Sequence, residues 1–130
     1  MEKIRILLLT HFIITTFWKY TDWAAAGYEL EAVSLSNSFD EYYRPSLSMC
    51  EEIRELTSQH QVDLVIIGNN LGGGLKMAAF VHEDLLPKTV VVWNSYRDEE
   101  TVPYAKMGIR HFGTRDQITQ IIQNILGASI

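Results

Sequence analysis

Residues 62–70 read VDLVIIGNN, a run of valine, leucine and isoleucine side chains that stops at a glycine and two asparagines. An apolar run of this length, bounded by turn residues, is typical of a strand that is covered on both faces of a sheet. Such strands are mostly parallel, and parallel strands need crossover helices to connect them. The stretch therefore predicts an α/β domain, with Gly68 at the corner where the strand becomes a loop.

Four further short runs predict strands on either side of this one. The run at 4–9 is rich in isoleucine and leucine, and the run TVVVW is almost entirely β-branched. These runs occupy residues 4–9, 28–33, 89–93 and 108–112.

Helical periodicity and helix-end residues fill the intervals between the strands. A capping box indicates where a helix begins, a glycine where it ends, and a proline is tolerated only in a first turn. We therefore expect a first helix over residues 14–27, with Gly27 as its C-cap, and a second that begins at a Ser48–Glu51 capping box. A third helix is expected over 75–86 and a short fourth around Pro103. The last should run from a Thr114–Gln117 capping box to Gly127.

Strands and helices thus alternate five times without a linker or an internal repeat. This order predicts a single domain over residues 1–130, a five-stranded parallel sheet in a three-layer α/β/α sandwich.

The composition excludes several classes of function. The chain has a net charge of −5 and its basic residues are scattered, so we expect no binding to nucleic-acid phosphates. The start of the chain resembles a signal peptide, but His11 and Lys19 interrupt that pattern, and no run is long enough to span a membrane. The single cysteine, Cys50, cannot form an internal disulfide, which favours a cytoplasmic location and a buried thiol on a helix.

Five segments of the chain resemble the receiver domain of bacterial response regulators. They read IRILLLTH, GYELEAV, VDLVIIGNNLGG, TVVVWNSYRDEE and AKMGIRHFGTRD, at residues 4–11, 27–33, 62–73, 89–100 and 105–116. The resemblance covers nearly the whole chain, apart from residues 36–48 and a shortened loop at 72–74. It implies a flavodoxin-like, receiver-like sheet with strand order 2-1-3-4-5.

The family transfers a phosphoryl group from a histidine kinase to an aspartate at the end of the third strand. Two acids after the first strand hold Mg²⁺, because a hard cation prefers oxygen ligands. A Thr or Ser after the fourth strand and a Lys after the fifth contact the phosphoryl oxygens. By resemblance, the acceptor falls on Gly68, or on Asn69 if the alignment shifts by one. The acid pair falls on Thr10 and His11. The Thr or Ser position falls on Asn94 and the Lys position on Arg115.

The resemblance therefore implies a degenerate phosphorylation site and predicts a pseudo-receiver. We expect no catalytic residue, no metal ligand, no cofactor and no enzymatic activity. Known pseudo-receivers sit in circadian-clock, motility and developmental regulators, where they act through protein–protein contacts. The expected partner is another protein or a second copy of this chain.

A second interpretation uses the crevice at the carboxyl ends of the strands as a small-ligand or anion sensor. The polar residues expected to converge there, which would leave the crevice neutral to positive, are Thr10, His11, Asn69, Asn70, Asn94, Ser95 and Arg115. The competing interpretation is a polar rim closed by its own hydrogen bonds, which we prefer because polar residues generally populate such loop tips.

Aromatic residues raise two further questions. Tyr96, Tyr104, Lys106 and Phe112 would lie on or near the face formed by the last two helices and the fifth strand, where a partner could bind; alternatively, Tyr104 and Phe112 pack locally. In the segment 36–48, Phe39, Tyr42 and Tyr43 could anchor a partner or fold back onto the domain, and folding back is preferred.

Overall fold

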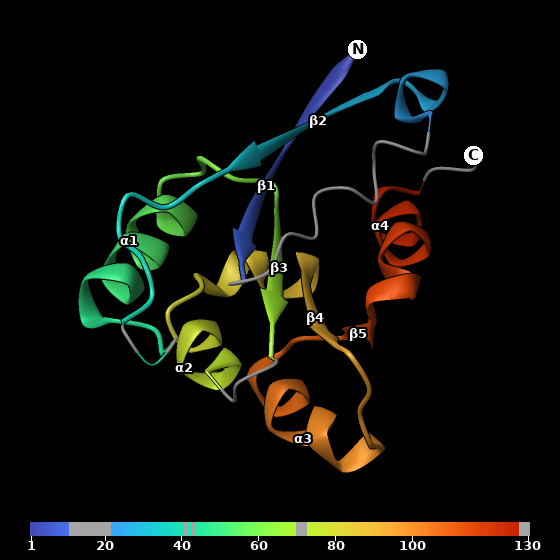
Figure 1. Cartoon of the computed structure of the whole chain (residues 1–130). Coiled ribbons are helices and arrows are strands. Elements are labelled where there is room, and N and C mark those ends of the chain that lie inside the picture. The colour runs from blue at the N-terminus through green and yellow to red at the C-terminus, as the bar shows by residue number, and fades with distance from the viewer. Residues whose placement is uncertain (11–21, 41, 43, 70–72, 128–130) are drawn as a thin grey trace.

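A computed structural model describes residues 1–10, 22–40, 42, 44–69 and 73–127. Five parallel strands form one sheet in the order β2-β1-β3-β4-β5 (Figure 1). The predicted sheet and its strand order are thereby confirmed. The strands are β1 (Glu2–Leu9), β2 (Tyr28–Val33), β3 (Leu64–Gly68), β4 (Thr89–Trp93) and β5 (His111–Thr114).

Helices cover both faces of the sheet and complete the three layers (Figure 1). One face packs against α1 (Leu47–Ser58), α2 (Gly74–Ala78) and α3 (Asp98–Met107). The other packs against α4 (Ile118–Leu126) and the 3-10 helix η2 (Trp23–Ala26). Two more 3-10 helices are η3 (Glu83–Lys88) and η4 (Arg115–Gln117).

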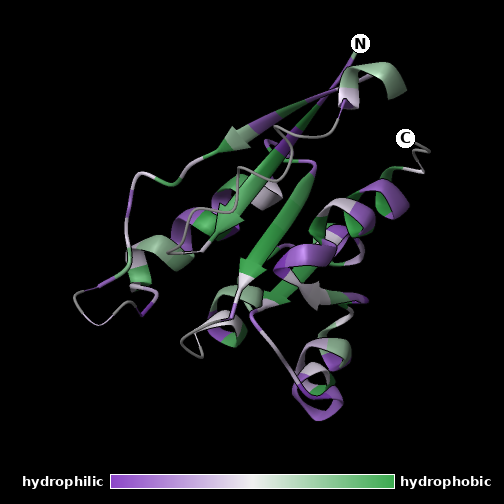
Figure 2. Ribbon diagram, turned by 45° about the vertical axis from the view of Figure 1, so that its right-hand side comes forward, coloured by the Kyte–Doolittle hydropathy of each residue, from purple (hydrophilic) through white to green (hydrophobic). Residues whose placement is uncertain are grey.

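The central strand β3 is apolar along its whole length because both of its faces are buried. Successive side chains of a strand point to opposite faces. Val65 and Ile67 of β3 accordingly join the core under α1 to α3, whereas Leu64 and Ile66 join the core under α4. All four are 0% exposed. Figure 2 shows the central strands in green between helices whose outer surfaces are purple.

The first turn of α1 begins earlier than the sequence predicted. Ser46 is the N-cap, and its Oγ accepts a hydrogen bond of 3.1 Å from Met49 N. Ser48 already lies within the helix, where it cannot cap. The predicted Ser48–Glu51 capping box is therefore wrong.

The predicted helix over residues 75–86 is also wrong, because α2 ends at Ala78. The amides of Phe80 and Val81 bond to carbonyls only three residues back, at 3.1 Å each. The next amide, of His82, donates instead to Thr57 Oγ1 in α1 at 3.0 Å. This amide is therefore not part of a helical ladder, and His82 has the extended conformation that precedes η3.

Two predictions around α3 need correction. Pro103 does not lie in a first turn, because α3 extends over ten residues and has this proline in its second turn, on an exposed surface where water can satisfy the carbonyl of Glu99. The predicted strand over 108–112 starts too early. Gly108 has a φ of +108° and ends α3 as a left-handed C-cap, so β5 begins only at His111.

Other end signals match the sequence. The Thr114–Gln117 capping box is present, with Gln117 Oε1 accepting from Thr114 N at 2.9 Å, and Gly127 ends α4. Gly27 ends η2 with a φ of +89°. The remainder of the helix predicted over 14–27 lies largely outside the described residues.

The segment before α1 folds back over the domain in part. Phe39 is partly buried against the core under α1 to α3, and the Glu52 carboxylate of α1 accepts the amides of Ser36 and Asn37 at 2.7 and 2.9 Å. Tyr42, in contrast, is 68% exposed. The preferred interpretation is therefore correct for Phe39 and not for Tyr42, while Tyr43 lies outside the described residues.

Cys50 lies in α1 with 0% exposure, which confirms that the thiol is buried. Burial raises the pKa of this thiol, against an opposing effect of Lys76. Since the thiolate is the reactive form, Cys50 behaves as a core residue. No helix in the described part of the chain is long and apolar enough to cross a membrane.

Candidate functional site

The parallel register brings the predicted site positions to one edge of the sheet. Gly68 pairs with Val92 and Trp93 pairs with Thr114, so β3, β4 and β5 end nearly side by side. Gly68 is the last residue of β3 and Asn69 begins the loop, as the sequence predicted. Thr10, Asn94 and Arg115 directly follow β1, β4 and β5 at this edge. His11 lies outside the described residues.

Asn69 is fixed at this edge by backbone and side-chain hydrogen bonds. Its amide N continues the sheet by donating to Val92 O at 3.0 Å. Its side-chain Oδ1 accepts two hydrogen bonds, from Tyr104 Oη at 2.7 Å and from Gly74 N at 3.1 Å. The side chain is thus held between α3 and the first residue of α2, as the polar-rim interpretation expects of this residue.

Gly74 is a glycine because the space around it is filled. A Cβ on Gly74 would lie against Tyr104 Oη and 2.6 Å from Asn69 Oδ1. Real side chains do not approach so closely, so α2 could not begin here with any other residue unless Tyr104 or Asn69 moved.

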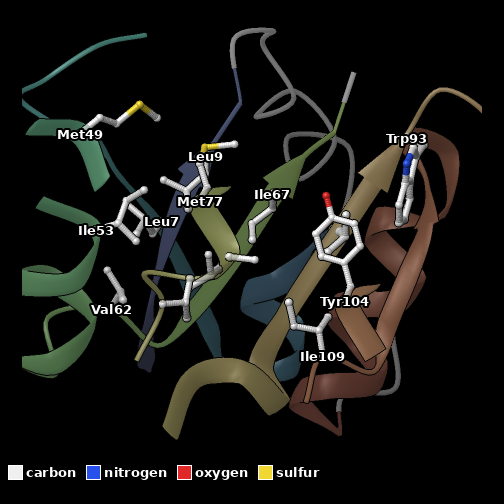
Figure 3. Packing of buried hydrophobic residues seen from close by; sticks show 14 residues of the cluster. Leu7, Leu9, Met49, Ile53, Val62, Ile67, Met77, Trp93, Tyr104 and Ile109 are labelled. Carbon is white, nitrogen blue, oxygen red and sulfur yellow. The ribbon is translucent and has the colours of Figure 1, made fainter. Parts of the chain in front are cut away.

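Four aromatic rings fill the space between the ends of β4 and β5 and helix α3. Trp93 stacks on Tyr96 with centroids 4.7 Å apart and meets the edge of Tyr104 at 5.6 Å. Phe112 lies 6.1 Å from Trp93 and 6.5 Å from Tyr104. Figure 3 shows Tyr104 standing next to Trp93, with its hydroxyl toward the arrowheads of the strands. We call Trp93, Tyr96, Tyr104 and Phe112 the aromatic cluster.

The exposure of these rings corrects the predicted partner face. Tyr104 is only 1% exposed, and burial raises the pKa of its phenol far above the ordinary value. A ring in this position cannot present itself to a partner, so Tyr104 leaves the candidate face and the alternative of local packing holds for it. Tyr96 and Phe112 are half-buried, and Lys106 is exposed.

Charged metal-binding side chains do not gather at this edge in the part of the chain that the structure describes. Among those residues, no three His, Cys, Asp or Glu side chains lie close enough together to hold a metal ion.

The sequence interpretation missed the hydrogen bonds that join Asn69, Gly74 and Tyr104. Tyr104 is 35 residues from Asn69 along the chain, and Gly74 is five residues away, which is no recognised capping spacing. One pattern could have indicated that Tyr104 is buried. Thr101, Tyr104 and Met107 recur every three residues and form the less exposed side of α3.

Comparisons with known proteins identify the fold. No protein-family model matches the chain, and no curated protein sequence matches it. Solved structures of receiver domains do. The signal receiver domain of NarL from Mycobacterium tuberculosis, which is described as a response regulator, has a TM-score of 0.61 and 16% identity, and the match covers 98% of this chain and 96% of that one.

Two further structures give the same result. The BeF3-activated N-terminal receiver domain of RstA from Klebsiella pneumoniae matches with a TM-score of 0.55 and 15% identity, over 97% of this chain and 96% of its own. HP1043, an orphan response regulator of H. pylori, matches with a TM-score of 0.51 and 14% identity, over 92% and 96%. At this level of identity, the similarity establishes a receiver-like fold and does not extend to activity.

Proposed function

With the receiver-like fold as premise, we propose that this chain is a signalling module that works without phosphorylation, by contact with a protein partner or a second copy of itself. The observation that carries the proposal is the end of β3. The family's acceptor position falls on Gly68, which has no side chain. The next residue is Asn69, and its side-chain amide oxygen accepts hydrogen bonds from Gly74 N and Tyr104 Oη.

The chemistry of the edge supports the same conclusion. An aspartyl phosphate needs a carboxylate nucleophile and a cation that neutralises the phosphoryl oxygens. By resemblance, the cation's two acids correspond to Thr10 and His11, and neither residue carries a carboxylate. Nucleophile and metal ligands are missing together, so one compensating substitution would not restore the reaction.

The surface left for a partner is smaller than the sequence predicted. Lys106 is exposed near the end of α3, and the half-buried rings of Tyr96 and Phe112 lie beside the packed ring of Trp93. Partly exposed aromatic rings suit a protein interface, because aromatic residues contribute much contact area at little conformational cost.

Light scattering over a series of concentrations tests this proposal. We expect the molar mass at each concentration to be the same before and after incubation with acetyl phosphate and Mg²⁺. If the chain self-associates through this face, Lys106→Glu lowers the mass whereas Lys88→Glu, an exposed lysine before β4, does not. A change in mass that depends on acetyl phosphate would contradict the proposal.

A further inference from the structure

One oxygen atom connects three elements at the carboxyl end of the sheet. Asn69 Oδ1 accepts from Tyr104 Oη in α3 at 2.7 Å and from Gly74 N, the first residue of α2, at 3.1 Å. The backbone of Asn69 is itself fixed to β4 through its bond to Val92 O. We call Asn69, Gly74 and Tyr104 the Asn69 clamp.

The Tyr104 donor of the clamp is tightly packed. Tyr104 is 1% exposed, and its ring is held edge-on by Trp93 at an interplanar angle of 86°. A shift of α3 would therefore carry the hydroxyl away from its acceptor within a buried environment, where an unmade hydrogen bond is costly. The hydroxyl also occupies the space that a Gly74 side chain would take, so it limits where α2 can begin.

We infer that the Asn69 clamp couples the start of α2 to α3, so that a displacement of either helix is transmitted to the other. A partner or ligand that moves the end of β3 would then change the exposed surface of α3 around Lys106 without any phosphoryl group. The clamp operates in this way whether or not the chain binds a protein partner.

Amide hydrogen exchange followed by NMR tests the coupling from the α3 side. Tyr104→Phe keeps the ring and removes only the hydroxyl. We expect the Gly74 amide, which has no bond to Tyr104, to exchange about five- to tenfold faster, as befits a weakened hydrogen bond. The exchange of the Ile122 amide in α4, on the other face of the sheet, measures any general loss of stability.

Tyr28→Phe is the matched control, because Tyr28 Oη donates to Leu126 O at 3.0 Å outside the clamp. It should leave the Gly74 amide unchanged. A Gly74→Ala variant tests the coupling from the α2 side. It should increase the exchange rate of the Ile109 amide, which donates to Tyr104 O at 3.2 Å.

The coupling is refuted if Tyr104→Phe increases the exchange rate of the Gly74 amide no more than that of the Ile122 amide. It is also refuted if Gly74→Ala leaves the exchange rate of the Ile109 amide unchanged relative to that of the Ile122 amide. Either result would mean that Asn69 makes two independent bonds. The clamp is supported if the Gly74 and Ile109 amides are both accelerated more than the Ile122 amide.

Discussion

Replacing Tyr104 with alanine should lower the free energy of unfolding by about 4 kcal/mol, the range found when large buried aromatic side chains are removed. The ring is 1% exposed and packs against Trp93 and Phe112, so its loss leaves a cavity in the aromatic cluster. The change also removes one of the two donors to Asn69 Oδ1. Urea unfolding of the two proteins measures the difference directly.

Tyr42→Ala is the control for this prediction. It deletes the same side chain from a position that is 68% exposed, where the Arg44 guanidinium lies 5.9 Å from the ring centroid. The expected change is within about 0.5 kcal/mol, as for most surface substitutions. Equal losses in the two variants would show that Tyr104 is not the buried anchor described above.

Replacing Asp63 with asparagine should lower the free energy of unfolding by about 1–2 kcal/mol at neutral pH. The loss should be smaller than on breaking a fully buried charged pair, because 34% of the Asp63 side chain is exposed. The Asp63 carboxylate accepts from Arg5 N at 2.8 Å and from Arg5 Nε at 3.1 Å, where β1 and β3 come together. Burial alone would raise the pKa of Asp63, but these hydrogen bonds hold it below its ordinary value.

The sign of the pH dependence follows from that lowered pKa. The unfolded chain takes up the proton first, at about pH 4, so the stabilisation by Asp63 is fully present above that pH and is lost as pH falls through the folded pKa. The difference in the free energy of unfolding between the wild type and Asp63→Asn should therefore disappear below about pH 4. Unfolding measured from pH 7 to pH 3 tests this, and a difference that stays constant would contradict it.

Glu31→Gln provides the comparison at neutral pH. Glu31 pairs with Lys3 at 3.3 Å, but both side chains are about half exposed. Ion pairs of this kind contribute little, so the expected change is below about 1 kcal/mol. If Glu31→Gln lowered the free energy of unfolding as much as Asp63→Asn does, the contacts of Asp63 would contribute no more to stability than an exposed ion pair.

The sequence predicted the sheet well because its central strands are apolar on both faces. The run TVVVW matches β4 at both ends. Around β5 the same reasoning failed, because Gly108 looks like the start of a strand and is in fact the C-cap of α3. A left-handed cap and a turn before a strand have the same local residues, and only the packing of α3 distinguishes them.

The positions of the candidate site could be predicted for a related reason. Parallel strands end at a common edge, so once the resemblance to receiver domains had assigned Gly68, Asn94 and Arg115 to the ends of three strands, they were expected at one end of the sheet. Their contacts could not be predicted. The bond between Asn69 and Tyr104 depends on how α3 docks, and no local pattern near either residue indicates it.

Hydrogen bonds at the end of β3 fix the positions of the two helices beside it. Asn69 and Tyr104 hold α2 and α3 to the end of β3 with side chains of this chain alone. In the proposed function, a partner would therefore meet a surface around Lys106 whose shape is set by packing and by the Asn69 clamp.

The most direct test of the account is the intact mass of the protein after incubation with acetyl phosphate and Mg²⁺, with an ordinary receiver domain that has its acceptor aspartate treated in parallel. The account predicts that the control gains one phosphoryl group and that this chain gains none. A gain of one phosphoryl group by this chain, mapped by fragmentation to the carboxyl ends of the strands, would contradict it and would identify an acceptor other than Gly68.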